Sequence, residues 1–308
     1  MSTSDGSPQP STAFIAPDSG TPRPLLVGLH SWGSNSQKAA NGSVFAKWAI
    51  QQGWHFVYPN FRGPNYTPQA MGSDLAVQDL VDAVRYMQKT ANVDPSRIYL
   101  IGASGGGHMA LLAAGRHPEI WAGVSAWASI TDIAAWYAEN MSSGNSGGYA
   151  NKIRRALGGS PDEESFRKEA EKRSPVTWLA KAKSVPLDIN HGFQDGRKGS
   201  VPFCHSLLAF NCVAAPEDRL PESGIREFYE TQQLPAGWPK PGADSLYKRD
   251  IIFRKISGNA RVTIFEGGHE VLYEPALNWL AQQRQGQPAV WTIQNNQNVE
   301  STDTESAK

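Results

Sequence analysis

Residues 98–118 read IYLIGASGGGHMALLAAGRHP, and this stretch decides the fold of the chain. An apolar run ends near a serine, Ser104, that stands among four glycines, and small apolar residues follow at once. The run IYLI is typical of a buried strand, and the residues after the serine are typical of a helix. The stretch therefore predicts a strand, a tight turn that carries a serine, and a helix.

Residues 102–106, Gly-Ala-Ser-Gly-Gly, fit the G-x-S-x-G pattern of a nucleophile elbow. In such a turn the serine takes strained backbone angles, so the residues two positions away on either side must be small. The hydroxyl then lies at the start of a helix, where amide N–H groups face a developing negative charge. The alternative interpretation is a plain helix start capped by serine. The strand before Ser104 and the helix after it favour the elbow.

Further apolar runs alternate with helical patterns along the chain, and this alternation predicts a mostly parallel sheet with helices on both faces. One helix is expected over residues 73–90, with Ser73 as its N-cap, because apolar side chains recur there with helical spacing. The expected strands are residues 25–29, 54–58, 98–101, 123–127, 187–190 and 262–265. The fold class is thus α/β.

The chain is expected to form one domain over residues 21–290. Residues 1–20, rich in Ser, Thr, Pro and Gly, predict a disordered arm, and residues 291–308 predict a loose polar tail. Residues 135–176, called the cap below, are expected to cover or rim the site. Residues 214–258 are a long, proline-punctuated insertion that is expected to be peripheral scaffold.

Composition excludes several classes of function. Lys plus Arg equals Asp plus Glu, at 29 each, and no basic stripe indicates nucleic acid as a partner. No apolar run approaches the length of a membrane span. The start lacks the pattern of a signal peptide. The compartment therefore stays open between the cytoplasm and secretion with the signal removed, and the oligomeric state is not indicated.

Neither a metal nor another cofactor is expected. The glycine-rich GASGGG lacks the Lys-Ser/Thr of a phosphate-binding loop, and the expected elements separate His191 from His205. Cys204 and Cys212 lie eight residues apart in one expected helix, about 12 Å along its axis, which is too far for a disulfide. Both are predicted to be free thiols.

A nucleophilic serine needs a base and an acid. His269 follows the last expected strand in the glycine-flanked loop FEGGHE, and Asp195 follows the strand at 187–190 in the loop NHGFQDGRKG. The order Ser104, Asp195, His269 is that of α/β-hydrolases. Asp188 lies inside a strand and is expected to point into packing or away, and Glu266 is too near His269 in sequence to orient it easily.

The remaining candidate residues concern the oxyanion and the substrate. The Gly105 N–H is one expected oxyanion donor, and the N–H of Trp32 or Ser31, in the loop after the first strand, is the second. Trp127, Trp136 and Tyr137 are candidate substrate-binding residues, alongside Trp32. Their rings suit a sugar face or a phenolic acyl group, and the alternative for each is packing in the core or a loop.

With these parts in place, the chain resembles the α/β-hydrolase superfamily, and more narrowly the catalytic domain of the prolyl oligopeptidase family and related acetyl- and feruloyl-type esterases. The resemblance rests on PNFRG (59–63), the elbow segment (101–123), HGFQDGRKGSVP (191–202) and FEGGHE (265–270). It implies nucleophile, acid and base roles for Ser104, Asp195 and His269. The sequence departs from the family in its oxyanion loop, which reads HSWG where relatives often carry HGG or YGG.

The leading functional hypothesis is a serine hydrolase that cleaves carboxylic esters, with an O-acylated carbohydrate as one possible substrate. The alternative is a serine peptidase of prolyl oligopeptidase type that cleaves short peptides with the same residues. Esters demand less help for the leaving group than amides, and these 308 residues hold no counterpart of the family's gating propeller, so the ester is favoured. A non-catalytic binding protein on the same fold is a remote third hypothesis.

Overall fold

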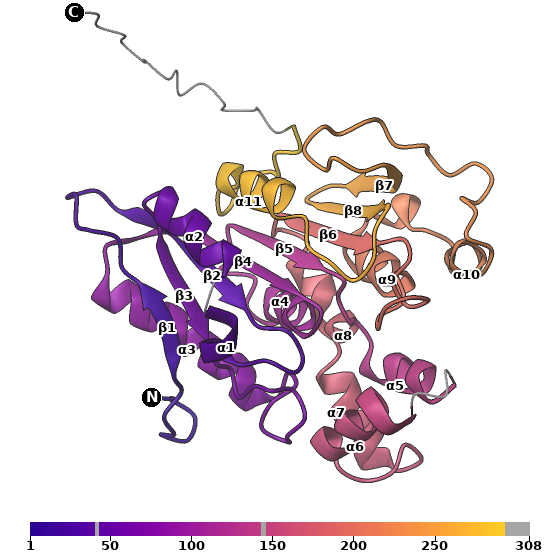
Figure 1. Cartoon of the computed structure of the whole chain (residues 1–308), viewed down its shortest axis with the longest axis horizontal. Coiled ribbons are helices and arrows are strands. Elements are labelled where there is room, and N and C mark those ends of the chain that lie inside the picture. The colour runs from indigo at the N-terminus through magenta and orange to yellow at the C-terminus, as the bar shows by residue number, and fades with distance from the viewer. Residues whose placement is uncertain (41–42, 143–145, 293–308) are drawn as a thin grey trace, which may run out of the picture.

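An eight-stranded sheet organises the part of the chain that the computed structural model describes, residues 1–40, 43–142 and 146–292 (Figure 1). The order of the strands across the sheet is β1-β3-β2-β4-β5-β6-β8-β7. Their bounds are β1 Ser11–Phe14, β2 Arg23–Leu29, β3 His55–Pro59, β4 Val93–Ala103, β5 Gly123–Trp127, β6 Leu187–Gly192, β7 Ile251–Ser257 and β8 Ala260–Phe265.

The six inner strands run parallel, and each of the two edge strands pairs antiparallel with its neighbour. The inner strands are the six that the sequence predicts, so the α/β-hydrolase fold is confirmed. Because parallel strands end at the same edge of the sheet, the loops that follow β2, β4, β6 and β8 meet there. That edge is where the candidate site lies.

Helices cover both faces of the sheet, because side chains alternate along each strand. In β2, Leu25, Val27 and Leu29 pack in one core cluster with α3, α4 and α9, while Leu26 packs in another with α2 and α11. The helix bounds are α1 Ser36–Ala40, α2 Val44–Gln51, α3 Asp74–Thr90, α4 Gly105–Arg116, α5 Ile133–Ser142, α6 Asn151–Leu157, α7 Glu164–Lys172, α8 Pro175–Trp178, α9 Cys204–Val213, α10 Glu222–Thr231 and α11 Tyr273–Gln282. Shorter turns of helix are η1 Ser146–Ala150, η2 Leu179–Ala182 and η3 Pro216–Asp218.

The expected helix at 73–90 is α3. Ser73 is its N-cap, as predicted, and its hydroxyl accepts a hydrogen bond from the Ala76 amide.

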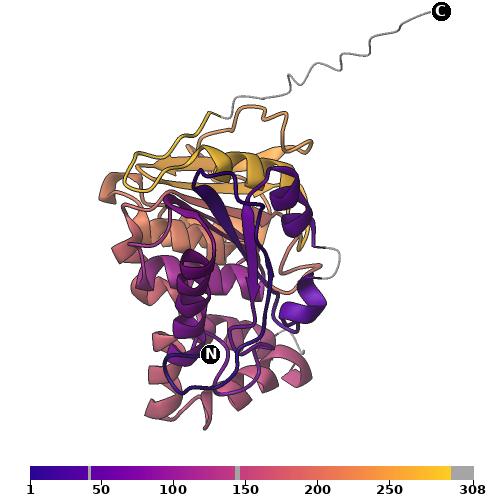
Figure 2. The same cartoon turned by 90° about the vertical axis from the view of Figure 1, so that its left-hand side faces the viewer.

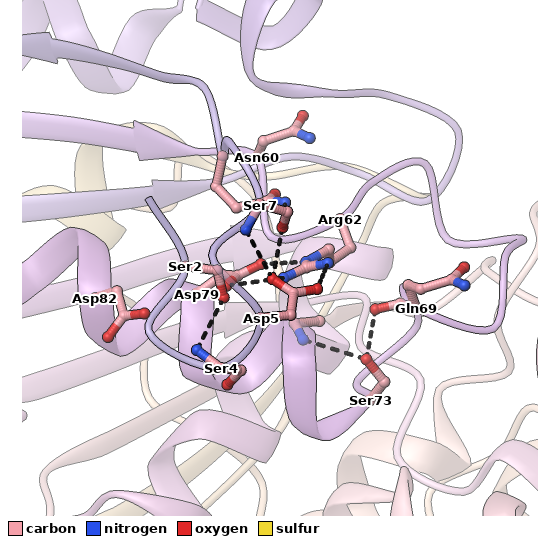
Figure 3. Close-up of polar contacts among 12 residues, drawn as sticks. Ser2, Ser4, Asp5, Ser7, Asn60, Arg62, Gln69, Ser73, Asp79 and Asp82 are labelled. Carbon is pink, nitrogen blue, oxygen red and sulfur yellow. Dashed lines mark hydrogen bonds and ion pairs between the residues drawn. The ribbon is translucent and has the colours of Figure 1, made fainter.

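The N-terminal arm differs from the expected disorder. Residues 11–14 form β1, which pairs with β3, and the residues before it lie against α3 and the loop that follows β3. The Arg62 guanidinium lies between the carboxylates of Asp5 and Asp79 (Figure 3). Its Nη1 and Nη2 each donate to an Asp5 oxygen at 2.9 Å, and its Nε donates to Asp79. The Thr3 amide donates to Asp82 at 2.7 Å. Composition missed this order because edge-strand pairing and ion pairs are made with distant residues.

The two expected insertions have different structures. In the cap, α5, α6 and α7 form a separate group at one end of the sheet and share a small apolar core with Trp32 (Figures 1 and 2). The segment 214–258 contains α10 and ends in β7, an edge strand of the main sheet. The two-residue Gly258-Asn259 loop that joins β7 to β8 is the sequence signal for this hairpin. The expected polar tail lies outside the described residues beyond residue 292.

Three further findings concern single features. Cys204 and Cys212, both in α9, are free thiols, as predicted. Among the described residues, no helix is long and apolar enough to cross a membrane. The same residues contain no group of three or more His, Cys, Asp or Glu side chains that could hold a metal ion.

Candidate active site

Ser104 stands in a strained turn between β4 and α4. Its φ of 58° and ψ of −121° lie outside the regions that residues with a side chain favour. The turn holds this conformation because the Ser104 amide donates to the Trp127 carbonyl at 2.9 Å. A side chain at Gly102 would overlap the Gly106 carbonyl, and one at Gly106 would lie 2.6 Å from the Leu29 carbonyl oxygen. The backbone of the predicted elbow therefore requires glycine at both positions.

The amides of Gly105 and Trp32 are close together beside this serine. A Cβ at Gly105 would lie 2.6 Å from the Trp32 backbone nitrogen. Among the described residues, neither amide donates a hydrogen bond to a backbone carbonyl outside regular helices and strands, and Gly105 is the first residue of α4. First-turn amides have no partner within their own helix. Two amides without a carbonyl partner thus lie close together next to Ser104.

The loop that carries Trp32 is braced by the loop after β3. The ring of His30 stacks on Phe61 with centroids 3.9 Å apart, and His30 Nε2 lies 2.8 Å from the Asn60 carbonyl. The Asn65 amide donates to the Trp32 carbonyl at 2.9 Å. Burial lowers the pKa of His30, which keeps its ring neutral in this packing. The Trp32 peptide is therefore fixed through its carbonyl while its N–H stays free.

Asp195 and His269 come from the loops after β6 and β8, and the two loops are joined by backbone hydrogen bonds. The Gln194 amide donates to the Gly267 carbonyl at 2.9 Å, and Gly192 packs directly against the Gly267-Gly268 backbone. These contacts place His269 Nδ1 2.6 Å from Asp195 Oδ2. The imidazole side chain is 28% exposed, whereas the carboxylate is fully buried.

The buried carboxylate of Asp195 is fully hydrogen-bonded. Its Oδ1 accepts from the amides of Gly196 at 2.9 Å and Val201 at 3.2 Å, and its Oδ2 also lies 3.0 Å from His191 Nε2. Burial by itself would raise the pKa of Asp195, but the hydrogen bonds from His191 and His269 outweigh burial and hold that pKa well below its usual range. Asp195 is therefore a carboxylate at any physiological pH.

Ser104 and His269 line the same cavity, of about 570 Å³. Its other lining residues are Ser31, Trp32, Gly33, Ala103, Ala128, Tyr149, Glu270, Val271 and Tyr273. Among the described residues, no hydrogen bond joins the Ser104 hydroxyl to the His269 imidazole directly. Catalytic hydrogen bonds often tighten only when substrate is bound. The arrangement thus provides a hydroxyl, an imidazole paired with a buried carboxylate, and free amides around one cavity.

Of the four aromatic residues expected at the substrate, Trp32 lines the cavity, whereas Trp127, Trp136 and Tyr137 are not among its lining residues. Trp127 is fully buried and packs against Tyr247 and Phe265, because its side chain points from β5 into the core. Trp136 is also buried and packs edge-on against Trp32, so it supports the cavity wall from behind. Tyr137 packs on Phe166 within the cap.

Sequence reasoning missed Tyr149 and Tyr273, which do line the cavity. Tyr149 lies in the cap, the segment expected to rim the site, and Tyr273 begins α11 four residues after His269. Position along the chain could therefore have indicated both, although no motif includes them.

The acidic residue that lines the cavity, Glu270, is already paired. Glu270 receives hydrogen bonds from the Gly268 amide and from Arg249, both at 3.1 Å. Asp188, the alternative acid, is buried in β6 and pairs with Arg261 at 2.8 Å, which confirms that it points into packing.

Comparison with known proteins identifies one family and several proteins that are similar over part of their length. A model of the prolyl oligopeptidase family matches residues 43–214, more than half of the chain. Feruloyl esterase B of Thermothelomyces thermophilus is 27% identical over 107 residues, 32% of this chain and 36% of that protein. Feruloyl esterase B of Neurospora crassa is 30% identical over 116 residues, 34% of this chain and 39% of that protein. This chain thus spans less than half the length of either relative.

Among solved structures, an acylaminoacyl peptidase of Pyrococcus horikoshii aligns with a TM-score of 0.48 at 17% identity. The alignment covers 66% of this chain and 32% of that one.

Proposed function

Because the chain belongs to the prolyl oligopeptidase family, we propose that it is a serine hydrolase that cleaves carboxylic esters through an acyl-enzyme. The observation that carries this proposal is the Asp195–His269 pair at the rim of the cavity that also holds the strained Ser104. Strained residues with a free hydroxyl and a nearby oriented imidazole are typical of covalent catalysis.

In the proposed reaction, His269 Nε2 takes the proton of the Ser104 hydroxyl as the oxygen attacks the ester carbonyl carbon. Asp195 keeps the proton of His269 on Nδ1 and stabilises the imidazolium. His269 then protonates the departing alkoxide, which leaves an acyl group on Ser104. A water molecule repeats the attack with His269 as base, releases the carboxylic acid and restores the hydroxyl.

The negative charge that develops on the carbonyl oxygen is assigned to the amides of Gly105 and Trp32. Their closeness and their lack of carbonyl partners support this assignment. Each such donor is worth about 3–4 kcal/mol of transition-state stabilisation, because it is aligned before the charge appears.

An ester is favoured over a peptide with a free amino terminus by the charges around the cavity. Binding a substrate ammonium group requires an unpaired carboxylate, and the acidic residue among the cavity's lining residues, Glu270, is already paired with Arg249. The ammonium of Lys152 also lies 5.1 Å from the Tyr149 ring at the cavity wall. A second cation would be repelled there.

The shape and lining of the cavity support an aromatic or sugar-like substrate. Tyr149 and Tyr273 line it together with Trp32, which is only 2% exposed, and aromatic side chains suit both phenolic acyl groups and sugar rings. An adjoining cavity of about 310 Å³ shares Ser31, Ala103, Val271 and Tyr273 with it. Two neighbouring spaces, the larger of which is lined by Ser104, would suit the acyl and alcohol halves of an ester. The feruloyl esterases that resemble the chain point to the same class of acyl group.

The test is a comparison of p-nitrophenyl acetate, methyl ferulate and an aminoacyl p-nitroanilide with the wild-type protein and Ser104→Ala. We expect ester turnover that Ser104→Ala abolishes, and labelling of Ser104 by a fluorophosphonate probe. Efficient anilide cleavage with poor ester cleavage would instead assign a peptidase. No turnover and no labelling of the folded protein would assign a binding protein on this fold.

A further inference from the structure

We propose that His191 is a positioning residue for the candidate acid, holding the Asp195 carboxylate in the orientation that His269 needs. The inference rests on the proposed function, because it concerns the same serine hydrolase site. His191 is the fifth residue of β6, and its side chain is fully buried and is not among the residues that line the cavity of His269.

The proton position on His191 follows from its neighbours. Nε2 lies 3.0 Å from Asp195 Oδ2 and 3.0 Å from the Val201 carbonyl oxygen. Both neighbours are acceptors, so Nε2 must carry the hydrogen. An Nε2 without hydrogen would place three lone pairs together in a buried space, which is strongly unfavourable.

The other ring nitrogen is satisfied by a residue of α9. Nδ1 lies 2.7 Å from the Ser206 hydroxyl oxygen. Since burial lowers the pKa of His191, the ring is neutral and Nδ1 is an acceptor. Ser206 therefore donates its hydroxyl hydrogen to Nδ1, and this bond fixes the tautomer that presents N–H to Asp195.

The consequence for Asp195 is a carboxylate that cannot turn. Oδ2 receives hydrogen bonds from two imidazoles, at 2.6 Å from His269 and 3.0 Å from His191. Oδ1 is held by two backbone amides. Because His191 is neutral, it orients Oδ2 without cancelling the negative charge that stabilises the His269 imidazolium. The two hydrogen bonds, from Ser206 to His191 and from His191 to Asp195, connect α9 and β6 to the site.

The experiment compares His191→Leu, His191→Gln and Ser206→Ala for ester turnover, fluorophosphonate labelling rate and thermal unfolding. We expect His191→Leu to lower kcat about tenfold to thirtyfold with KM nearly unchanged, because the lost contact acts on the chemical step. His191→Gln keeps an N–H donor at similar reach and is expected to retain kcat within threefold. Ser206→Ala is expected to lower kcat about threefold to tenfold, because without the Ser206 hydroxyl His191 is no longer held as the Nε2–H tautomer.

The matched control is His55→Leu, the same change at a buried histidine whose ring contacts the Ala16 amide and the Asn92 carbonyl at the opposite end of the sheet. It is expected to lower thermal stability and leave kcat within twofold. Nitrogen-15 NMR of histidine-labelled protein gives a readout that needs no variant, and is expected to show His191 as the Nε2–H tautomer.

A folded His191→Leu protein with kcat within twofold of wild type would overturn the proposal. So would a His191→Gln protein as impaired as His191→Leu, since a purely structural role depends on packing and not on the donor. An Nδ1–H tautomer would overturn it even if every variant failed to fold. The proposed function fails differently, through a wild-type protein that neither turns over ester nor labels at Ser104.

Discussion

Substituting Gly105 by alanine tests the proposed oxyanion donors directly. The new Cβ would lie 2.6 Å from both the nitrogen and the Cα of Trp32, and 2.9 Å from Nδ2 of Asn65. Carbon atoms in contact prefer about 3.5–4.0 Å, so the loop that carries Trp32 must retreat by about 1 Å. The atoms that must move are backbone atoms, and no side-chain rotation relieves the contact.

The expected loss follows from the role of that loop. A retreat of this size removes one of the two amides from the developing oxyanion, and the loss of one such donor lowers kcat by about 10²–10³, or about 3–4 kcal/mol. KM is expected to change little, because the charge that the amide stabilises appears only after substrate has bound. Steady-state kinetics with p-nitrophenyl acetate measures both quantities.

Gly115→Ala is the matched control in the same helix. Its Cβ would lie 2.7 Å from the Trp178 backbone, a similar overlap, but ten residues away, or about 15 Å along α4. We expect this variant to lose thermal stability and keep kcat within twofold. A Gly105→Ala protein that keeps more than a third of the wild-type kcat would refute the assignment of its amide and of the neighbouring Trp32 amide.

Three further predictions concern the acid, a buried histidine and the arm. Asp195→Asn is expected to lower kcat by about 10³–10⁴ by releasing the tautomer of His269, and a folded variant within tenfold of wild type would contradict that role. Burial lowers the pKa of His108 to about 4. Between about pH 4 and pH 6.5 the His108 imidazole is protonated in the unfolded chain but neutral in the folded protein. The free energy of unfolding therefore does not depend on this group above about pH 6.5, and it falls by about 3 kcal/mol on acidification to pH 4. The urea concentration at the unfolding midpoint should change less with pH in His108→Gln than in the wild type between about pH 4 and 6.5. Equal pH dependence in the two proteins would refute the burial argument. Arg62→Ala leaves the buried Asp79 carboxylate without its cation and is expected to lower the free energy of unfolding by about 3–5 kcal/mol, measured by urea titration. The added change Asp79→Asn should restore part of this loss. A loss below about 1 kcal/mol would exclude a structural role for the pair.

The elbow was predictable from sequence because its constraints are local. The tight turn at Ser104 demands small residues at fixed offsets, and the strand and helix on either side are read from apolar spacing alone. The same holds for the loops that carry Asp195 and His269, because each directly follows an apolar strand. Edge strands were harder to predict. β1 lies in a polar, proline-containing segment, and β7 follows a long irregular one, so only pairing with a neighbouring strand stabilises them.

By itself, the sequence determined the inner strands, the glycines of the elbow and the chain order of Ser104, Asp195 and His269. Tertiary structure alone decided which side chains meet. It placed the His191 ring against Asp195, and it turned Trp127 into the core while bringing Tyr149 to the cavity wall. The physical reason is that backbone conformation follows from short-range sterics and apolar periodicity. The direction and partners of a buried side chain are instead set by segments tens of residues away that must fill the same space.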